Sequence, residues 1–229
     1  MEINQFYIAG KFITPDGKEI IDLINPATEE KVGHVVSGSE KDVNDAVNSA
    51  QHAFTYASSL SLEQKKTILQ EIIDGMDERR EEFAQVISEE MGAPIKVARG
   101  AQFSSGKVHF INTLKVIDGF SFSEVHDNIT LNKLPVGPVG MITPWNWPLN
   151  QMCTKIASAI AAGTSFVLKP SEITPGAAQL FAEVVHKTSM PKGMFNLVHG
   201  YGATVGKAMS QHNDICLLYT SDAADDTSG

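Results

Sequence analysis

The stretch "VGMITPWNWPLNQMCTKIASAIAAGTSFVLKPSE", residues 139–172, decides the fold of this chain. It opens with a short apolar run, "VGMIT", and continues with a helical pattern in which Met152, Ile156 and Ile160 recur every fourth residue before Gly163. A second apolar run, "TSFVL", follows at once. A strand, a helix and a strand with such short connections predict a parallel βαβ unit with a right-handed crossover.

The same alternation continues toward the C-terminus. Thr174 is expected to cap a second helix that has Pro175 at its first position. "GMFNLV" (193–198) predicts a third strand, and "ATVGKAMSQH" (203–212) starts a third helix. The predicted fold class is therefore α/β, with a Rossmann-like parallel sheet preceded by N-terminal strands and a helical segment. The sheet edge beyond "GMFNLV" is expected to lack a partner strand, and an unpaired edge favours aggregation.

The residues before this region predict strands, then helices, then a hairpin. "FYIAGKFI" and "EIIDLI" flank the turn signal "TPDGK", so both runs are expected to be strands. Ser39 and Ser61 are each predicted to begin a helix, because a residue three positions later can complete a capping box. A third helix is expected to stop at Gly92, and a fourth to cover "KVARGAQFSSGKVHFINTLKVI". The alternating segment 121–134 is predicted to be an exposed hairpin.

Composition excludes several classes of protein. The formal net charge of −9 at pH 7 disfavours binding to the phosphate backbone of nucleic acids. Neither a basic-then-apolar leader at the N-terminus nor an apolar stretch long enough to cross a bilayer is visible. Cys153 and Cys216 form no disulfide framework, and the histidines show no ligand spacing, so no metal is assigned. A reducing cytoplasm is the expected location.

Three segments directly follow the three predicted parallel strands. They are "TPWNWP" (143–148), "KPSE" (169–172) and "HGYGATVG" (199–206). The carboxyl ends of parallel strands meet at one edge of a sheet, and ligands of open α/β sheets bind beyond that edge. We therefore expect the three segments to form one site.

Two of these segments are candidates for recognising a nucleotide. The Glu172 carboxylate can accept from both hydroxyls of a ribose, and Lys169 can donate to ribose or phosphate oxygens. A solvated turn with a surface ion pair is the plainer interpretation of these two residues taken alone. Gly200, Gly202 and Gly206 let a phosphate approach backbone N–H groups at a helix start, although glycine is also common in such turns for steric reasons.

Asn146 lies between the only two tryptophans of the chain, with a proline beyond each. Proline restricts its own φ and the residue before it, so this segment is stiff. A stiffly mounted amide suits an oxyanion donor, whereas a turn residue whose side chain bonds its own backbone is the plainer interpretation. Cys153 is either a nucleophile near a helix N-terminus or a small buried hydrophobe between Leu149 and Ile156.

These residues closely resemble the aldehyde dehydrogenase superfamily. "LPVGPVGMITPWNWPLNQMCTKIASAIAAGTSFVLKPSE" carries its paired signature, Pro-Trp-Asn-aromatic-Pro followed by Lys-Pro-Ser-Glu, and "FYIAGKFI…INPATEEKVGHV" resembles its N-terminus. The resemblance extends from about Phe6 to Ile215. It implies that residues 1–215 are the N-terminal, cofactor-binding part of an enzyme that oxidises an aldehyde to a carboxylic acid with NAD or NADP. The family works through a cysteine thioester, which a glutamate-activated water releases.

The resemblance implies roles for individual residues. Asn146 corresponds to the family's oxyanion-hole asparagine, and Lys169 and Glu172 correspond to the pair that holds the adenosine ribose. Glu172 favours NAD, because it would repel the 2′-phosphate of NADP, although some members with this pair accept both. Gly202 and Gly206 correspond to the loop beside the adenine and the pyrophosphate. The positions assigned to cofactor binding in this way are Ile142, Thr143, Pro144, Trp145, Asn146, Lys169, Ser171, Glu172, Gly202, Ala203 and Gly206.

The resemblance also bears on assembly and on missing parts. The hairpin 121–134 resembles the start of the arm through which members form homodimers or homotetramers. Trp147 and His199 stand where phenylalanine and proline are usual. The family's strand with a Phe-Thr-Gly-Ser turn, its glutamate base and its nucleophilic cysteine are not found in this sequence. No dehydrogenase activity is therefore expected from this chain alone, and Cys216 is not expected to be the nucleophile.

Residues 216–229, "CLLYTSDAADDTSG", resemble nothing in the family. A transposon end used in sequencing-library adapters would encode Cys-Leu-Leu-Tyr-Thr-Ser, and the adapter would continue with Asp-Ala-Ala-Asp. We therefore interpret 216–229 as a non-native tail on a truncated gene fragment. The alternative is a divergent C-terminus, and the source DNA across codon 215 distinguishes the two. The rival to an enzyme fragment is a non-catalytic module that binds a dinucleotide or assembles with a full-length partner.

Overall fold

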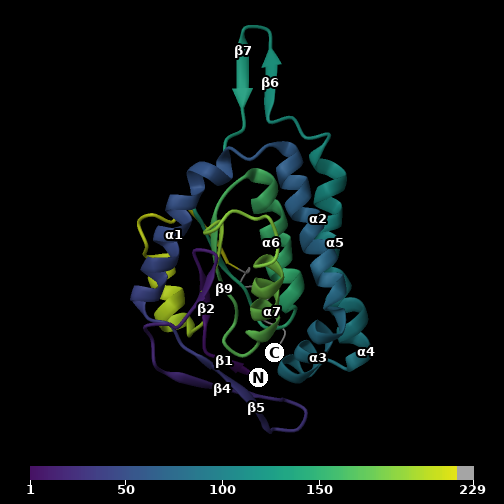
Figure 1. Cartoon of the computed structure of the whole chain (residues 1–229), viewed down its shortest axis with the longest axis vertical. Helices are drawn as coiled ribbons and strands as arrows, with labels where there is room; N and C mark the ends of the chain where they lie inside the picture. Colours follow the sequence, from purple (N-terminus) through teal and green to yellow (C-terminus); the bar gives the residue numbers. More distant parts are fainter. Residues whose placement is uncertain (221–229) are drawn as a thin grey trace.

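A central sheet lies between helical layers, and a long hairpin projects at one end of the molecule (Figure 1). The computed structural model describes residues 1–220. The strands of the central sheet are β2 (Phe6–Ile8), β3 (Lys11–Ile13), β8 (Val139–Ile142), β9 (Phe166–Lys169), β10 (Phe195–Leu197) and β11 (Leu217–Tyr219). Their order across the sheet is β11-β8-β9-β10-β2-β3.

Strands β8, β9 and β10 run parallel, as the alternation of strands and helices predicts. The strand β11, which was not predicted, pairs parallel to β8. In the register of β8 with β9, Ile142 lies opposite Lys169. In the register of β9 with β10, Leu168 lies opposite Leu197. The three strands β8, β9 and β10 therefore end at the same edge of the sheet, and the predicted Rossmann-like α/β class is confirmed.

The edge beyond β10 is paired, so the prediction that it would be free is wrong. β2 runs antiparallel to β10 with Tyr7 opposite Leu197, and β3 continues the sheet outward. β2 and β3 form a hairpin of their own, because Ala9 and Gly10 adopt the positive φ values, 53° and 75°, of a tight two-residue turn. The prediction failed because it considered only strands that would follow "GMFNLV" in the chain, whereas the partner strand β2 comes from the N-terminus. The run "FYIAGKFI", predicted as one strand, is divided into β2 and β3.

The opposite edge of the sheet carries β11, which pairs with β8 and places Leu218 opposite Gly140. β11 belongs to the segment 216–229 that we interpret as a non-native tail. Backbone hydrogen bonds between strands do not depend on the origin of the side chains, so that interpretation stays a prediction. Residues 221–229 of the segment lie outside the described residues.

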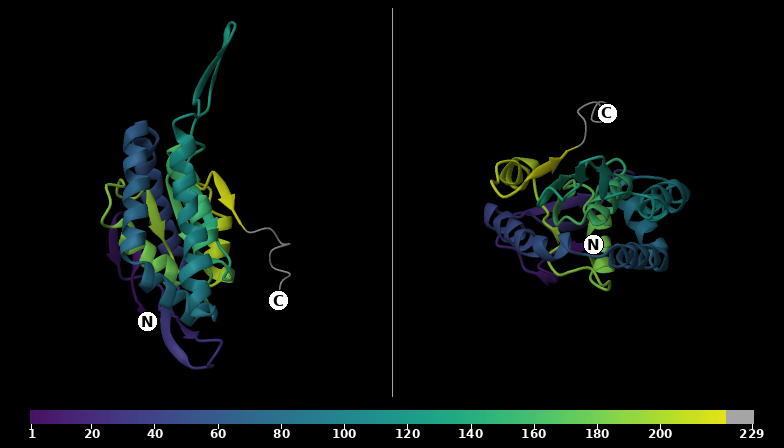
Figure 2. Two further views of the ribbon diagram at one scale, coloured as in Figure 1. Left: turned by 90° about the vertical axis from the view of Figure 1, so that its right-hand side faces the viewer. Right: turned by 90° about the horizontal axis from the view of Figure 1, so that it is seen from above.

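Helices cover both faces of the sheet (Figures 1 and 2). The α-helices are α1 (Glu40–Ser58), α2 (Leu62–Glu78), α3 (Arg80–Met91), α4 (Ile95–Val97), α5 (Phe103–Ile117), α6 (Pro148–Ala162), α7 (Gly176–Val185) and α8 (Lys207–Ser210), and the π-helical turns are η1 (Ala98–Gln102) and η2 (Gly202–Gly206). α1 and α8 pack on one face, α6 and α7 on the other, and α2, α3 and α5 lie outside α6 and α7. The side chains of β9 alternate accordingly, with Phe166 and Leu168 in the larger core and Val167 in the smaller one.

Most of the predicted helix ends are observed. Ser39 and Ser61 begin α1 and α2 with complete capping boxes, and Gly92 ends α3 in the left-handed conformation with a φ of 75°. The expected cap of α7 is wrong, because Pro175 is the N-cap residue and makes no side-chain cap. Thr174 instead donates its hydroxyl to the backbone oxygen of Trp145 at 3.5 Å.

The segment around Gly100 and Gly106 is helical, as expected, but the π-helical turn η1 precedes α5. Gly106 lies where α5 packs against the start of α6. A Cβ at this position would come within 2.7 Å of Leu149 Cβ and 3.2 Å of the Leu149 carbonyl carbon. Glycine therefore permits the close approach of the two helices here.

The hairpin predicted at residues 121–134 is formed by β6 (Ser123–His126) and β7 (Ile129–Asn132), which project away from the body (Figure 2). Its turn contains Asp127 with a φ of 50°. The apolar side chains of the hairpin are exposed, Val125 by 73% and Ile129 by 69%. Within residues 1–220, no helix combines the length and the apolar character that crossing a membrane requires.

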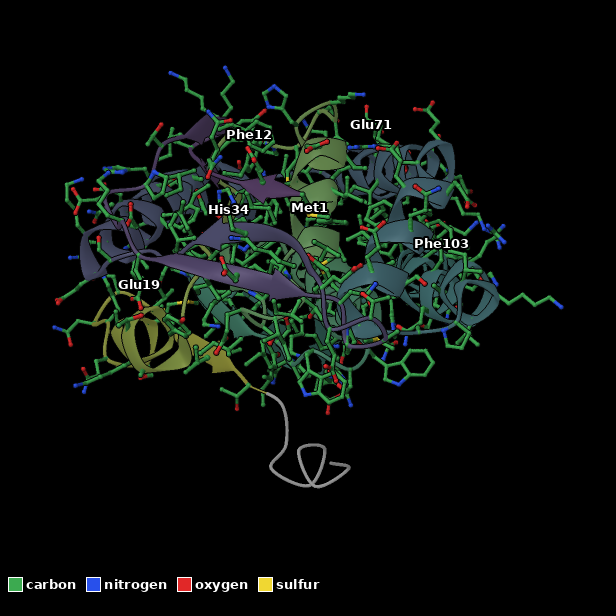
Figure 3. The ribbon with its side chains drawn as sticks, turned by 90° about the horizontal axis from the view of Figure 1, so that it is seen from below. Met1, Phe12, Glu19, His34, Glu71 and Phe103 are labelled. Carbon is green, nitrogen blue, oxygen red and sulfur yellow. The ribbon has the colours of Figure 1, made fainter. Side chains whose placement is uncertain are left out.

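A second, smaller sheet packs at the N-terminal end. Its strands, in the order β1-β5-β4, are β1 (Glu2–Ile3), β5 (Lys31–Val36) and β4 (Ile20–Ile24). The His34 N–H donates to the Met1 carbonyl at 2.9 Å, and Figure 3 shows these two residues side by side. The Met1 side chain reaches the start of α7, since a Cβ on Gly176 would lie 2.7 Å from Met1 Cε.

Glu90, near the end of α3, caps α7 from outside that helix. Its two carboxylate oxygens lie 3.1 and 2.9 Å from Gly176 N, and the residue is 5% exposed. Burial raises the pKa of Glu90 to about 8, although the Gly176 N–H acts in the opposite direction. Between its ordinary pKa of 4.5 and about 8, the folded chain holds a proton that the unfolded chain has released, so stability falls as the pH rises.

Glu90→Gln is expected to flatten this pH dependence, because it removes the titrating group and keeps the shape of the side chain. Relative to the variant, the wild-type chain should lose up to about 1.4 kcal/mol of unfolding free energy per pH unit between about pH 5 and about pH 8. Urea unfolding followed by circular dichroism across this window measures the difference. Glu78→Gln, at the exposed last position of α2, is the control. Identical slopes for wild type and Glu90→Gln would contradict the assignment.

Candidate functional site

The loops after β8 and β9 are bonded to each other at the carboxyl edge of the sheet. The Thr143 N–H donates to the Lys169 carbonyl at 3.1 Å, which extends the ladder between the two strands by one residue. Further along, the Thr174 hydroxyl donates to the Trp145 carbonyl at 3.5 Å. The first two segments predicted to form a site are therefore fixed relative to each other at two places.

Lys169 and Glu172 form an ion pair whose lysine is inside the protein. Lys169 is 2% exposed, and its Nζ donates to Glu172 Oε2 at 3.1 Å and to the Pro170 carbonyl at 2.9 Å. Burial lowers the pKa of Lys169, and the Glu172 carboxylate opposes that shift. The Glu172 side chain is 29% exposed, so part of its carboxylate is open to a ligand. A solvated turn with a surface ion pair does not describe this arrangement.

His199 lies close to the same lysine. It is 1% exposed, and its Nε2 is 3.1 Å from Gln179 Oε1. Burial and then the charge of Lys169 lower the pKa of His199 to about 3, so the ring is neutral near pH 7. Because Gln179 Oε1 can only accept, we assign the ring proton to Nε2. A neutral imidazole does not compete with Lys169 for the Glu172 carboxylate.

The glycine-containing segment after β10 reaches the same edge. A Cβ on Gly206 would lie 3.8 Å from Ile142 Cδ1 and 3.8 Å from Lys169 Cδ. Gly202 is exposed with open space around it, and Ala203 lines a surface hollow between α1 and α8. The structure thus brings Ile142, Lys169 and Gly206 together, and it leaves Gly202 and Ala203 at the surface.

Asn146 stands on the loop between β8 and α6. Trp145 and Trp147 on either side are 43% and 36% exposed, whereas Asn146 is half-buried. Its Oδ1 is buried and has no hydrogen-bond partner among the described residues. The plainer turn interpretation requires a hydrogen bond from the local backbone to this oxygen, and that bond is not formed. The Asn146 carbonyl accepts from Gln102 Nε2 at 3.3 Å.

The remaining predicted positions lie within the same loops. Pro144 is half-buried next to the buried Thr143. Ser171 is half-buried, and its carbonyl accepts from the Thr174 N–H at 3.3 Å. Within residues 1–220, no group of three or more histidine, cysteine, aspartate or glutamate side chains is placed to hold a metal ion.

Cys153 packs as a small hydrophobe in α6. It is fully buried in the larger core, together with Leu149 and Ile156. Burial raises the pKa of its thiol far above the ordinary range. A thiol with this environment is neither accessible nor ionised near neutral pH, so the nucleophile interpretation does not fit Cys153.

Sequence patterning assigned no role at the site to three polar residues that lie there, namely Gln102, Thr174 and His199. Each is at most 2% exposed and bonds a residue 20 to 44 positions away in the chain. A polar residue at a position that the apolar periodicity assigns to the core is the signal that would have found Gln102, which directly precedes the buried Phe103. The partners themselves leave no local signal.

Known proteins resemble this chain over nearly its whole length. The model of the aldehyde dehydrogenase family matches residues 12–220. The match extends beyond Ile215, where the resemblance was expected to end, and includes residues 216–220 of the segment that we interpret as a tail. A curated relative from Staphylococcus haemolyticus, assigned by name to the aldehyde dehydrogenases, is 38% identical over 215 residues. The match covers 94% of this chain and 45% of that protein, so the chain spans about half the length of the curated relatives it matches.

Solved structures agree with the sequence comparisons. An aldehyde dehydrogenase from Bartonella henselae superposes with a TM-score of 0.92 at 38% identity, covering 95% of this chain and 47% of that one. A mutant of aldehyde dehydrogenase C from Pseudomonas syringae, solved with NAD+ and octanal, gives a TM-score of 0.92 at 44% identity and covers 94% and 44%. The fold described above corresponds to the superposed portion of these two enzymes, somewhat less than half of each chain.

In the native chain, one thiol is expected to react rapidly with an aromatic disulfide reagent, because Cys216 is exposed and Cys153 is buried. Cys216→Ser should remove the fast reaction, and urea should then restore one reactive thiol. Absorbance of the released thiolate measures both. Rapid labelling of Cys153 in the folded Cys216→Ser chain would contradict its burial and would restore the nucleophile interpretation.

Proposed function

The chain belongs to the aldehyde dehydrogenase family, and we propose that it holds the dinucleotide in an enzyme that oxidises an aldehyde to a carboxylic acid. The observation that carries the proposal is that Ile142, Lys169 and Gly206 lie together at one edge of the sheet. The partly exposed Glu172 is paired with Lys169 at the same place. Ligands of open parallel sheets bind at this edge. The chain spans 45% of its relative's length, so the activity is proposed for the full-length protein.

The residues at this edge fit a nicotinamide dinucleotide. Glu172 is held by a buried ammonium and keeps part of its carboxylate free, which suits a pair of ribose hydroxyls. Gly206 has no side chain to separate a ligand from the backbone of the turn. We assign Lys169, Ser171 and Glu172 to the adenosine ribose, Gly202, Ala203 and Gly206 to the adenine and pyrophosphate, and Ile142, Thr143, Pro144, Trp145 and Asn146 to the nicotinamide side.

The choice of dinucleotide follows from charge. Glu172 would repel the 2′-phosphate of NADP, so NAD is the proposed cofactor and NADP the weaker one. The dinucleotide supplies the hydride acceptor when it is bound. Asn146 supplies an amide donor on a loop whose backbone is already held by hydrogen bonds from Gln102 and Thr174 and to Lys169. Little reorganisation is therefore needed as charge develops on the aldehyde oxygen.

The other parts of the reaction are assigned to no residue of this chain. The resemblance to the family implies that a cysteine nucleophile and a glutamate base complete the site. Neither Cys153 nor Cys216 fits the role of that nucleophile. We therefore propose that the chain alone has no dehydrogenase activity. Turnover by the purified chain that is lost in Cys216→Ala would contradict this.

Substrate, assembly and location are proposed on separate grounds. An aldehyde is the substrate class that the family implies. The β6–β7 hairpin supports a homodimer or homotetramer of the full-length protein, because its two strands pair only with each other among the described residues and expose Val125 and Ile129. The free Cys153 and Cys216 support a reducing cytoplasm, and the net charge of −9 disfavours nucleic acid as a partner.

Glu172→Ala should weaken NAD binding to the chain by about 10- to 100-fold, because a charged acceptor of hydroxyl hydrogen bonds is lost. Isothermal titration calorimetry with NAD measures the change. Glu63→Ala is the matched control, since Glu63 is also the i,i+3 partner of a lysine, Lys66, at 3.4 Å on the exposed side of α2, and it should leave the affinity unchanged.

Two outcomes of that titration would count against the proposal. NAD binding that survives Glu172→Ala in a folded chain would contradict the ribose assignment. A folded wild-type chain without affinity for NAD would show that these residues do not form a dinucleotide site by themselves. Circular dichroism of each variant establishes that it is folded.

In the full-length protein, Asn146→Ala should lower kcat by about 100- to 1,000-fold, the loss that follows removal of one oxyanion donor. The loss should persist at saturating NAD, because the oxyanion role concerns the reacting aldehyde and not the binding of NAD. Steady-state NADH formation at saturating aldehyde measures kcat. Asn112→Ala, at an exposed position of α5, is the control, and an unchanged kcat in Asn146→Ala would remove the oxyanion role.

A further inference from the structure

We propose that Gln102, the last residue of the π-helical turn η1, is the positioning residue of the loop that carries Asn146. The inference deepens the proposed function and rests on it in one respect, namely that Asn146 meets the ligand. Gln102 is 2% exposed and does not reach a ligand itself. It acts through the backbone carbonyl of Asn146, to which it donates.

The surroundings of Gln102 determine the orientation of its amide. Nε2 lies 3.3 Å from the Asn146 carbonyl oxygen and 3.4 Å from Met91 Sδ. Both of these atoms are acceptors, so the nitrogen and not the oxygen of the amide must face them. The bond to Asn146 is the stronger of the two, because a thioether sulfur is only a weak acceptor.

This arrangement costs the fold stability. Gln102 Oε1 and Asn146 Oδ1 are both buried without a hydrogen-bond partner among the described residues. Each of these buried oxygens has lost its hydrogen bonds to water without replacement, which lowers the stability of the fold. A methionine at position 102 would match the length of the glutamine without an unpaired oxygen. A costly buried amide at the contact between the helical layer and this loop indicates a role in placing the loop.

The π-helical turn explains why a glutamine faces the loop at all. A π turn widens one turn of a helix, and such turns are frequent at functional sites. η1 ends at Gln102, and α5 begins with Phe103, which Figure 3 marks in the helical layer. Ala98 and Phe103 are fully buried. Gln102 therefore occupies an inward-facing position that an ordinary amphipathic helix would give to an apolar residue.

Gln102 complements the tethers that come from the sheet edge. The Thr143 N–H bonds Lys169, and Trp145 accepts from Thr174. Gln102 holds the next carbonyl along, that of Asn146, from the helical layer. Consecutive carbonyls are thus held from two different layers, which leaves the backbone at Asn146 little freedom and fixes the direction of its side chain.

Gln102→Met tests this role, because methionine keeps the length of the side chain and removes the amide. Trp145 and Trp147 are the only tryptophans in the chain and flank Asn146, so tryptophan fluorescence reports on this loop. Thermal stability should change little, because loss of the unpaired Gln102 Oε1 offsets loss of the hydrogen bond to the Asn146 carbonyl. The tryptophan emission should shift, and the acrylamide quenching constant should rise about twofold or more, because losing one hydrogen bond raises the open population of the loop.

A matched control and a second variant make the outcome decisive. Gln70→Met repeats the change at an exposed glutamine of α2, which donates to Asp74 Oδ1 at 2.8 Å, and should leave the fluorescence unchanged. Wild-type emission and quenching in folded Gln102→Met would overturn the proposal, since methionine preserves packing. If that variant does not fold, Gln102→Glu in mild acid replaces it, because the protonated carboxyl can donate to Asn146. Altered emission of the folded acid form would likewise overturn the proposal.

Titration with NAD separates this inference from the proposed function. The fluorescence measurements use no ligand, so they test whether Gln102 positions the Asn146 loop whether or not NAD binds. If the wild-type chain binds NAD, Gln102→Met should weaken the affinity for NAD about fivefold, because the loop that carries Asn146 is displaced. An unchanged affinity would overturn the link between Gln102 and the ligand. A wild-type chain that does not bind NAD would contradict the proposed function alone.

Discussion

The parallel register of β8, β9 and β10 is the constraint on which the site depends. Ile142 lies opposite Lys169, and Leu168 lies opposite Leu197, so the three strands finish together. Parallel neighbours need crossover connections, and the helices α6 and α7 provide them on one face of the sheet. The residues after each strand must therefore leave the sheet beside one another, whatever their separation in the chain.

Lys169 illustrates what the site costs the fold. An ammonium at 2% exposure has lost most of its hydration, and the Glu172 carboxylate and the Pro170 carbonyl replace only part of it. The same position in β9 continues the buried run that Phe166 begins, where an apolar side chain would stabilise the sheet at no such cost. A buried charged residue where an apolar one would be more stable is expected mainly at functional positions. His199, neutral and buried beside the lysine, adds a second polar group to the same region.

The Asn146 loop depends on both layers of the molecule. The sheet edge holds it through Thr143 and Trp145, and the helical layer holds it through Gln102. The close approach of α5 to α6 at Gly106 keeps that layer near the loop. A change in helix packing would therefore move the amide that we assign to the aldehyde. Glu90 of α3 holds α7 in a similar way, because its carboxylate accepts from the N–H of Gly176, the first residue of α7. Gly176 directly follows the loop after β9.

Local features followed from the sequence by itself. The α/β class, the caps at Ser39 and Ser61, the end of α3 at Gly92 and the exposed hairpin depend on residues a few positions apart, and periodicity and turn chemistry report them. The tertiary structure alone decided that β2 covers β10, that Lys169 is inside, and which buried groups hold the loops. Gln102 and Asn146 are 44 residues apart, and Glu90 and Gly176 are 86 apart. Contacts at such separations are set by how helices and strands pack, and no local pattern in the sequence records them.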